Sequence, residues 1–338
     1  MKPLVSILIP AFNAQEWIAH TIQSAIDQTW QRKEIIIVDD GSDDQTLSIA
    51  RRFGSKEVKI VTQPNQGAAA ARNKAFFLCQ GDYIQWLDAD DLLAPDKIAQ
   101  QMRVAEHCGD SRILLSSAWG RFIYRVNRAK FVPTSLWRDL SPVEWLICKM
   151  GENVFMQTDT WLVSRHLCEA AGPWDTRQLS DDDGEYFCRV ILASNGIRFV
   201  PEAKAFYRAN PVNRLSYIGV SEKKQDALLL SIQLHVKYIQ SLEDSDRVRT
   251  ACVRFLQELL IYFYPERPDI VAELETLAVR LDGRLRVPRL RWKYAWMKPL
   301  FGWDLARRAQ LVLPQFKASL LRCWDRAMYK MEKSGFGL

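Results

Sequence analysis

The sequence predicts an α/β fold in which a mostly parallel sheet is flanked by helices and followed by a helical C-terminal extension. In the first hundred residues, short β-branched runs alternate with helical patterns, which is typical of βαβ units. Beyond residue 221 the pattern is helical. The chain has 338 residues, of which 48% are hydrophobic and 25% charged, so it can bury a sizeable core and is neither disordered nor collagen-like.

Four strands are expected in the first part of the chain, and a helix is expected after each. The strands are predicted at 4–9, 34–38, 58–61 and 83–87. The second strand is apolar throughout, as expected for a strand covered on both faces. The first helix is expected to begin at Asn13, because Glu16 completes a capping-box pattern. The next helix runs to about residue 53, an alanine-rich helix covers 68–78, and Pro95 opens the fourth.

The remainder of the chain changes from a mixed pattern to a helical one. Strands are expected at 113–117, 121–124 and 199–207, and helices at 142–149, 165–171 and 182–194. Four further helices are expected at 222–241, 245–264, 268–281 and 303–332, with prolines between them. The chain is therefore predicted to consist of an α/β domain, 1–215, and a helical region, 216–338.

The positive charge is concentrated near the C-terminus. The formal net charge is +6, but residues 280–338 alone contain 14 Lys and Arg against 4 Asp and Glu. Tryptophans lie among these basic residues at 292, 296, 303 and 324. This mixture predicts that the tail, about 284–338, binds an anionic membrane surface. Packing of the tail on its own domain and a contact between subunits are the alternatives, and nucleic acid is not an expected partner, since no recognition fold accompanies the charge.

Cysteine usage and hydropathy indicate the compartment. The seven cysteines are odd in number, widely spaced and without a CxxC pair, which disfavours a disulfide framework and structural zinc. The N-terminal apolar run is short and ends at Pro10, so it predicts a strand and not a secretory signal. No stretch reaches the roughly 18 uncharged apolar residues of a spanning helix. The expected location is the cytoplasm, at the inner face of the plasma membrane if the tail binds lipid.

Acidic residues occur in three groups at the ends of predicted strands and in the loop before 182–194. The groups are Asp39 and Asp40, then Asp88, Asp90 and Asp91, and finally Asp181, Asp182 and Asp183. Ligands bind beyond the carboxyl ends of the strands in open α/β sheets, so the groups are expected to converge. Converging carboxylates repel one another unless a cation lies among them, and a divalent metal that bridges phosphate oxygens is the ordinary solution. Asp43 and Asp96 are expected to serve only in a turn or at a helix N-cap.

Four ordered motifs carry a resemblance to a known family. They are VSILIPAFN at 5–13, IVDDGS at 37–42, GAAAARN at 67–73 and WLDADD at 86–91. Together they resemble the successive signatures of the family-two glycosyltransferases, which have a GT-A fold. The resemblance covers about residues 3–210 and implies a bacterial-type inverting glycosyltransferase.

The resemblance implies a nucleotide site near the first two strands. Pro10, Ala11 and Asn13 resemble the turn that lies against the nucleotide. Asp40, with Asp39 beside it, resembles the carboxylate that accepts a hydrogen bond from uracil. The implied donor is therefore a UDP-sugar.

The resemblance also implies a phosphate and metal site. Arg72 resembles a basic residue near the nucleotide phosphates, where a guanidinium suits phosphate oxygens; its alternative role is a surface charge on a helix. Asp88 and Asp90 match a DxD pair, with Asp88 reaching ribose or sugar hydroxyls and Asp90 ligating the metal. Mn²⁺ or Mg²⁺ is the implied cofactor.

A further resemblance concerns the catalytic base. The segments 172–175 and 182–189 are similar to the second half of the family domain, where an acidic pair opens a helix and its second member is the base. This implies Asp183 as the base. Because the acidic run has three members, Asp182 is the alternative. The family often places an Arg and a His after the following strand, whereas this chain has Arg208 there and no His.

The expected activity is transfer of a sugar from a nucleotide-sugar to a glycan or lipid-linked glycan acceptor, in polysaccharide or cell-envelope glycan biosynthesis. The alternative is a catalytically silent module with the same fold that binds sugar nucleotides or glycans. Such a module could lose Asp40, Asp88, Asp90 or Asp183 at little cost, and all four are present. A Rossmann oxidoreductase is excluded, because no GxGxxG follows the first strand.

Overall fold

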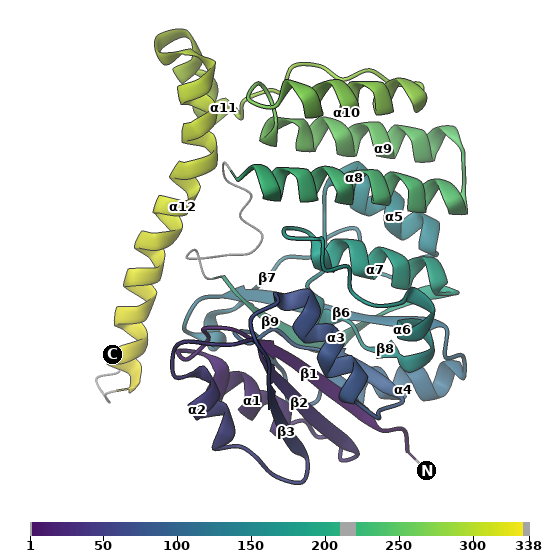
Figure 1. Cartoon of the computed structure of the whole chain (residues 1–338), viewed down its shortest axis with the longest axis vertical. Helices are drawn as coiled ribbons and strands as arrows, with labels where there is room; N and C mark the ends of the chain where they lie inside the picture. Colours follow the sequence, from purple (N-terminus) through teal and green to yellow (C-terminus); the bar gives the residue numbers. More distant parts are fainter. Residues whose placement is uncertain (1, 210–220, 334–338) are drawn as a thin grey trace.

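The computed structural model describes residues 2–209 and 221–333, without the side chains at 304, 314–318 and 333. These residues form two sheets with helices packed on them, followed by a layer of C-terminal helices (Figure 1). The structure therefore confirms the predicted α/β fold with its helical extension. The predicted domain boundary at 215 and 216 lies outside the described residues and stays a prediction.

The first sheet has the strand order β3-β2-β1-β4-β8, in which the first four strands are parallel and the last is antiparallel to β4. Its strands are β1 (Val5–Ala11), β2 (Lys33–Asp39), β3 (Val58–Thr62), β4 (Tyr83–Trp86) and β8 (Val163–Ser164). Alternate side chains of a strand point to opposite faces. Ile7 and Ile9 accordingly belong to one buried cluster and Leu8 to the other. The four predicted strands are confirmed to within two residues at each end.

Helices cover both faces of this sheet. Residues of α1 (Ile18–Ile26) and α4 (Lys97–Cys108) pack in the cluster with Ile7, whereas α3 (Ala68–Leu78) packs in the cluster with Leu8. The alanine-rich helix α3 has the predicted bounds. The helix α2 (Thr46–Arg51) ends two residues before the predicted position.

The predicted start of the first helix was wrong. The helix α1 begins at Ile18 and has no side-chain cap. Asn13 lies in a turn with a φ of 47°. Its N–H donates to Ser42 Oγ at 3.1 Å, and its Oδ1 accepts from the N–H of Asp43 at 3.1 Å. Asn13 therefore ties the end of β1 to the loop after β2 and does not cap a helix.

The second sheet has the order β5-β9-β6-β7, and its central pair β6–β9 is parallel. Its strands are β5 (Leu92–Leu93), β6 (Ile113–Phe122), β7 (Lys130–Phe131) and β9 (Gly196–Arg208). The prediction of two strands at 113–117 and 121–124 was wrong, because β6 is continuous. The interruption in the pattern lies near Gly120, where a Cβ would collide with the ring of Phe131, and near Ser117, after which the partner strand β9 has an irregular insertion between Val200 and Lys204.

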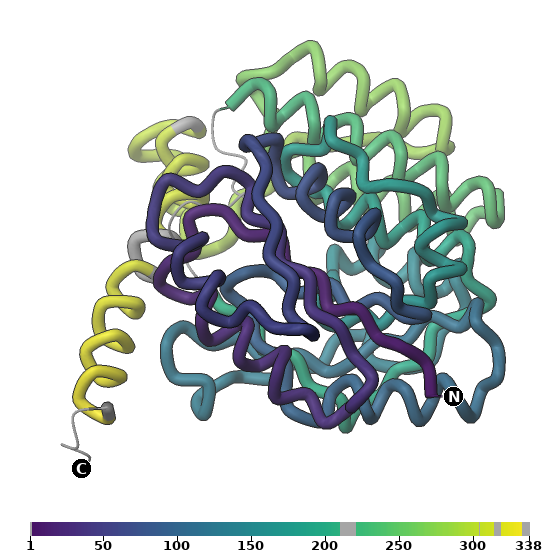
Figure 2. Tube along the Cα trace, turned by 60° about the horizontal axis from the view of Figure 1, so that its bottom comes forward, coloured from purple at the N-terminus to yellow at the C-terminus, as the bar shows by residue number. Residues whose placement is uncertain are grey.

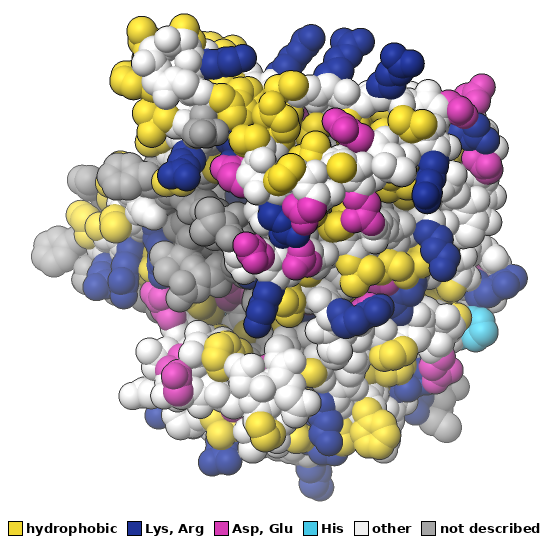
Figure 3. All heavy atoms as spheres, turned by 45° about the horizontal axis from the view of Figure 1, so that its top comes forward, with side chains coloured by type: hydrophobic (Ala, Val, Ile, Leu, Met, Phe, Trp, Pro, Cys, Tyr) yellow, Lys and Arg dark blue, Asp and Glu magenta, His cyan; other side chains and the backbone are white. Residues whose placement is uncertain are grey.

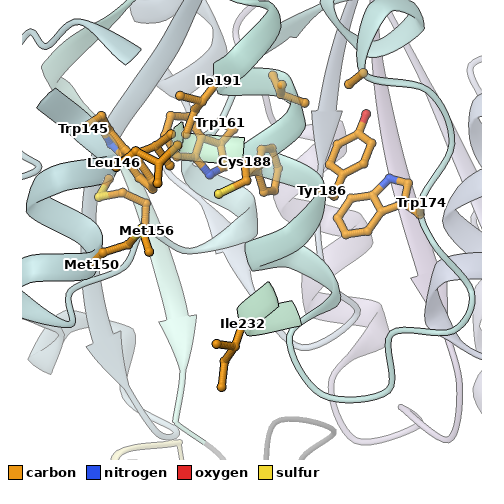
Figure 4. Close-up of a cluster of buried hydrophobic side chains, with 14 of the residues drawn as sticks. Trp145, Leu146, Met150, Met156, Trp161, Trp174, Tyr186, Cys188, Ile191 and Ile232 are labelled. Atoms are coloured by element: carbon orange, nitrogen blue, oxygen red, sulfur yellow. The ribbon is translucent and has the colours of Figure 1, made fainter. Parts of the chain in front are cut away.

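The C-terminal helices share a core with the α/β part. The helices α5 (Pro142–Glu152) and α7 (Asp182–Ala193) lie beside α8 (Glu222–Leu242) and α9 (Asp246–Leu259), while α6 (Arg165–Ala171) packs on α7 and α10 (Pro268–Arg280) packs on α9 (Figure 1). Contacts join α5 to α9 and α7 to α8. One hydrophobic cluster extends from Trp145 and Ile191 to Ile232, and its side chains are drawn in Figure 4. Short 3-10 helices are η1 (Val126–Arg128), η2 (Thr158–Thr160) and η3 (Leu260–Tyr262).

The last helices lie along one side of the molecule, as both views show (Figures 1 and 2). They are α11 (Trp292–Ala295), which was not predicted, and α12 (Met297–Lys333). Gly302 interrupts α12 with a φ of 80°, so the regular helix predicted at 303–332 follows this kink. No helix in the described part of the chain is long and apolar enough to cross a membrane.

Candidate active site

The loops after β1 and β2 lie side by side. Ala11, the last residue of β1, pairs with Asp39, the last residue of β2. The N–H of Asp40 donates to the carbonyl of Ala11 at 2.8 Å. Together with the bonds of Asn13 to the second loop, this contact unites Pro10, Ala11, Asn13, Asp39 and Asp40 at one edge of the sheet. The structure thus brings together all the residues of the predicted nucleotide turn and its carboxylates.

Asp40 organises the loop that leads into α3. Its buried carboxylate accepts hydrogen bonds from Gln63 Nε2 at 2.7 Å, from the N–H of Gln66 at 3.0 Å and from the N–H of Gly67 at 2.8 Å. Gly67 precedes α3 with a φ of 89°, a conformation that favours glycine. Each carboxylate oxygen can accept two hydrogen bonds. Oδ2, which accepts only the bond from Gly67 within the described residues, therefore has capacity for a ligand donor.

Asp39 is buried but only partly satisfied. Its Oδ2 accepts from the N–H of Ser42 and from the hydroxyl of Thr62, both at 3.3 Å. Its Oδ1 has no hydrogen-bond partner among the described residues. A buried acceptor without a partner costs about 1–3 kcal/mol. A ligand N–H that reached this oxygen would remove that cost, so Asp39 is as good a candidate for base recognition as Asp40.

Arg72 joins carboxylates from two distant parts of the chain. Its Nη2 donates to Asp88 Oδ1 at 2.7 Å and its Nη1 to Asp182 Oδ2 at 2.5 Å. Its guanidinium lies 4.4 Å from the centre of the Trp174 ring, which stacks on Tyr186 (Figure 4). Burial lowers the pKa of Arg72, but the charges of Asp88 and Asp182 outweigh this effect and raise it above its usual value. With 5% exposure, Arg72 is not a surface charge; it is a cation among the converging aspartates.

The loop after β4, which carries Asp88 and Asp90, is held by Arg208. Arg208 Nε donates to the carbonyl of Asp90 at 2.7 Å, and its backbone N–H donates to Asp91 Oδ1 at 2.6 Å. The guanidinium lies over the ring of Trp17, 4.0 Å from its centre. Burial, with the nearby charge of Asp90, raises the pKa of Asp91 well above its usual range. Asp91 is thus an internal anchor, whereas Asp88 and Asp90 are partly exposed and can meet a ligand.

Two buried ionisable side chains near this loop were not predicted. Lys97 Nζ donates to Gln85 Oε1 and to the carbonyl of Trp161, and Gln85 Nε2 donates to the carbonyl of Asp159. Burial lowers the pKa of Lys97 to about 7 and raises that of Asp159 to about 7. No motif surrounds either residue in the sequence. The only signal was a lysine in the first turn of a helix, which is usually a solvated residue.

Three consecutive aspartates at the start of α7 have three different environments. Asp181 accepts a hydrogen bond from the hydroxyl of Ser231, in α8, at 2.5 Å. Asp182 is bound by Arg72. Asp183 accepts a hydrogen bond from the following backbone N–H, and burial together with the charges of Asp182 and Asp181 raises its pKa to about 7. A carboxyl group that titrates near neutral pH is suited to proton transfer.

A metal site made of protein ligands alone is not found in the described ranges, where no three His, Cys, Asp or Glu side chains group to hold an ion. Proteins usually bind Mg²⁺ through one or two carboxylates, with substrate phosphates and water as the other ligands. The partly exposed carboxylates of Asp88 and Asp90 fit such a shared site, and Arg72 occupies one oxygen of Asp88. The donor set therefore fits a metal that is bound together with a substrate.

A comparison with known families identifies the domain that carries most of these residues. The sequence profile described as Glycosyl transferase family 2 matches residues 6–127. Residues 6–127 are therefore similar to family 2 glycosyl transferases. This result confirms the resemblance seen in the motifs. The family 2 domain includes the aspartates 39, 40, 88 and 90 and Arg72, whereas the acidic run at 181–183 lies beyond the matched residues.

Relatives with this domain are glycosyltransferases, and their similarity to the chain is local. The putative teichuronic acid biosynthesis glycosyltransferase TuaG of Bacillus subtilis is 41% identical over 104 residues, which cover 30% of this chain and 41% of the relative. Chondroitin synthase of Escherichia coli is 44% identical over 98 residues, which cover 28% of this chain and 14% of the relative. The chain therefore spans less than half the length of these curated relatives.

Solved structures extend the likeness of fold beyond the family 2 domain. The crystal structure of S. aureus TarS 1-349 in complex with UDP has 15% identity and a TM-score of 0.60, and the match covers 90% of both chains. The same protein in complex with UDP-GlcNAc has 17% identity and a TM-score of 0.58, over 84% of this chain and 93% of the other. The chain has the GT-A glycosyltransferase fold, with its C-terminal helices following.

Proposed function

We propose that the chain is an inverting glycosyltransferase that uses a UDP-sugar to extend a glycan or lipid-linked glycan in polysaccharide or cell-envelope synthesis. One observation carries the proposal: the buried guanidinium of Arg72 binds both Asp88, in the family 2 domain, and Asp182, in the acidic run. This contact supports a donor site that lies next to Asp183. The catalytic part would lie in residues 1–215 and the supporting helices in 216–338.

The nucleotide specificity would come from the edge of the sheet formed by β1 and β2. The imide N–H of uracil is a donor, whereas the equivalent ring nitrogen of cytosine is an acceptor. An unpartnered buried Oδ1 on Asp39 and spare capacity on Asp40 Oδ2 both favour a donor. The structural likeness to TarS, which has been crystallised with UDP and with UDP-GlcNAc, supports a uridine nucleotide.

The proposed reaction needs one base and stabilisation of one leaving group. The carboxylate of Asp183 would take the proton from the acceptor hydroxyl while that oxygen forms its bond to the anomeric carbon. The bond between the anomeric carbon and the diphosphate oxygen breaks with inversion, and UDP leaves with its electron pair. Arg72 lies beside Asp88 and Asp182, where its two N–H groups could turn to phosphate oxygens. Asp182 is the less suitable base, because its carboxylate is neutralised by Arg72.

Mn²⁺ or Mg²⁺ is the proposed cofactor, held by Asp90 with Asp88 next to it. When bound, the ion would supply positive charge to the departing diphosphate. The two carboxylates orient the ion and the sugar, while Arg208 fixes the loop that carries them. We place the reaction in the cytoplasm, since all seven cysteines are free, in agreement with a reducing compartment.

A panel of nucleotide sugars tests the proposal. The purified full chain is incubated with each sugar nucleotide and Mn²⁺, and nucleotide release and binding are measured. Release of UDP, and of no other nucleoside diphosphate, is the expected result. UDP binding is also measured for a matched pair of variants, Asp39→Asn and Asp40→Asn. Loss of the carboxylate that accepts a hydrogen bond from uracil should weaken UDP binding about tenfold or more, so the more affected variant identifies this residue.

The silent binding module is the second candidate. Binding of a UDP-sugar without hydrolysis or transfer, even with every acceptor tried and with Mn²⁺ present, would favour it over the enzyme. Binding of neither a sugar nucleotide nor a glycan would contradict both candidates. The four aspartates at 40, 88, 90 and 183 are all present, and two of them, Asp88 and Asp183, lie near the charge of Arg72, which supports the enzyme.

A further inference from the structure

An aromatic and basic surface lies at the start of the C-terminal tail. Residues 284–303, which we call the tail patch, contain six Lys and Arg and no Asp or Glu. All six basic side chains are exposed, and so are those of Trp292, Trp296, Leu300 and Phe301. Figure 3 shows apolar side chains gathered at the upper left corner of the molecule, with Lys and Arg beside them. A soluble protein has little reason to expose so many large apolar groups together unless they bind something.

Within the described residues, no carboxylate neutralises the charge of the tail patch. None of its six basic residues forms an ion pair with a carboxylate of the described residues. Lys293 and Lys298 instead lie over the rings of Trp292 and Trp303, at 5.9 and 5.5 Å. The surface therefore presents positive charge and aromatic rings in the same place.

The helix α12 that follows is anchored through its inner face. Arg307 donates to the carbonyl of Ile261 at 2.9 Å, and Asp325 forms an ion pair with Arg125 at 2.8 Å. Arg322 pairs with Glu16 at 3.2 Å. α12 is therefore held on the C-terminal helical region near its start and on the α/β part near its end. The predicted packing of the tail on its own domain is thus correct for this face of α12.

The opposite face of α12 carries an exposed apolar stripe. Its members are about one or two helical turns apart, as expected for one side of a helix. They are Leu305, Val312, Leu313, Leu320, Leu321 and Met331. The described acidic side chains in 284–332, Asp325 and Glu332, are both paired with Arg125. The stripe and the tail patch together therefore form an amphipathic surface with net positive charge.

We propose that the tail patch and the outer stripe of α12 bind the surface of a lipid bilayer that contains anionic phospholipids. A basic face with Trp, Leu and Phe is the composition of helices that lie in the plane of a membrane interface, and anionic lipid attracts each exposed Lys or Arg. A second copy of the chain is a poorer occupant, since a two-fold interface would bring the six basic residues against themselves. This inference does not depend on the proposed function, because lipid binding can be measured without turnover.

Sedimentation of the full chain with vesicles tests the inference. We expect binding to vesicles of phosphatidylcholine mixed with phosphatidylglycerol, weaker binding to pure phosphatidylcholine, and a loss of binding as salt is added. Equal binding to both vesicle types at every salt concentration, or binding to neither, would overturn the proposal.

Two variants locate the binding surface. Trp292→Ala with Trp296→Ala removes the aromatic part, and Arg289→Gln, Arg291→Gln and Lys293→Gln together remove half of the charge. Each set is expected to reduce vesicle binding about tenfold or more at low salt. The control for the first set is Phe77→Ala, since Phe77 and Trp292 are both 81% exposed. The control for the second is Arg51→Gln with Arg52→Gln, two exposed residues at the end of α2.

The controls also decide between lipid and protein. If the control variants lost as much vesicle binding as the tail patch variants, binding would depend on the general charge or hydrophobicity of the protein, and the proposed surface would be contradicted. Sedimentation velocity gives the oligomeric state of each variant without lipid, and circular dichroism shows whether it is folded. A dimer that the tail patch variants dissociate, without any binding to vesicles, would assign the surface to a second copy and overturn the lipid proposal.

Discussion

The two acidic regions of the candidate site are held in different ways. Asp40 is bound by donors only 23 to 27 residues away, within the loop that precedes α3. Asp182 is bound by Arg72, 110 residues away, and Asp181 by Ser231, 50 residues away. The nucleotide edge is therefore fixed by local structure, whereas the geometry at the proposed base depends on how α3, α7 and α8 pack together.

The variant Asp183→Asn separates the two regions most strongly. Removing the base is expected to lower kcat by about a thousandfold, within the usual range for general base catalysis. UDP affinity should change little, since the nucleotide edge is independent of α7. Transfer rates and UDP calorimetry provide the two measurements.

Asp182→Asn is the matched control for that experiment. It removes one neighbouring carboxylate and should leave measurable transfer. The opposite result, in which Asp182→Asn loses transfer and Asp183→Asn keeps it, would identify Asp182 as the base. A parallel loss of UDP binding in Asp183→Asn would show that the regions are not separate.

Arg72→Lys should weaken the link between the two regions. A lysine keeps the charge but lacks the planar fork that reaches Asp88 and Asp182 at once. We expect kcat/KM to fall about 10- to 100-fold. Arg51→Lys, on the exposed face of α2, is the control and should have no effect. Wild-type kcat/KM in Arg72→Lys would mean that charge alone is required.

The pH profile examines the acidic run more finely. The pKa of Asp183 is raised to about 7, so below that pH the group is protonated and cannot accept a proton. The value of kcat/KM should therefore rise with pH through about 7 and then level off. Asp182→Asn removes a like charge and frees Arg72, and both effects lower the pKa of Asp183. The rising limb should move to lower pH in this variant, and a shift to higher pH would contradict the assignment.

Ser231→Ala should give the smallest effect. It removes the hydrogen bond from α8 to Asp181, which is expected to cost about 1 kcal/mol of unfolding free energy. Transfer should fall only a few-fold, because Asp183 itself is retained. Ser241→Ala is the control on the same helix, where the exposed hydroxyl bonds only to its own helix. Urea unfolding and transfer assays of both variants measure the difference.

The parts of the fold that were predicted correctly depend on local pattern. Strands such as β2 are continuous apolar runs, and α3 has a glycine before it and alanines on its buried face. The wrong predictions arose where a local sequence pattern had a different structural role from the one it usually indicates. Asn13 resembled a cap but lies in a turn, and Gly120 divided the pattern of one continuous strand. Strands of two residues, such as β5, carry no periodicity.

In the candidate site, too, the residues that belong to local motifs were predicted and the contacts between distant residues were not. Motifs named the aspartates and Arg72, because each motif lies next to a strand or at the start of a helix. The contact of Arg72 with Asp182 could not be read from the sequence, since it depends on tertiary packing across 110 residues. Asp159 and Lys97 were missed for the same reason. The proposal of Asp183 as the base depends on the partners of the three carboxylates in 181–183, which the sequence pattern does not give.

The bridge made by Arg72 has a practical consequence. Charge repulsion among Asp88, Asp182 and Asp183 is already relieved by a side chain of the protein itself. Folding therefore has no need of a dissolved ion, and treatment with a chelator should leave the melting temperature unchanged while it stops turnover. The enzyme could then be purified and stored in EDTA and restored by adding Mn²⁺ to the assay.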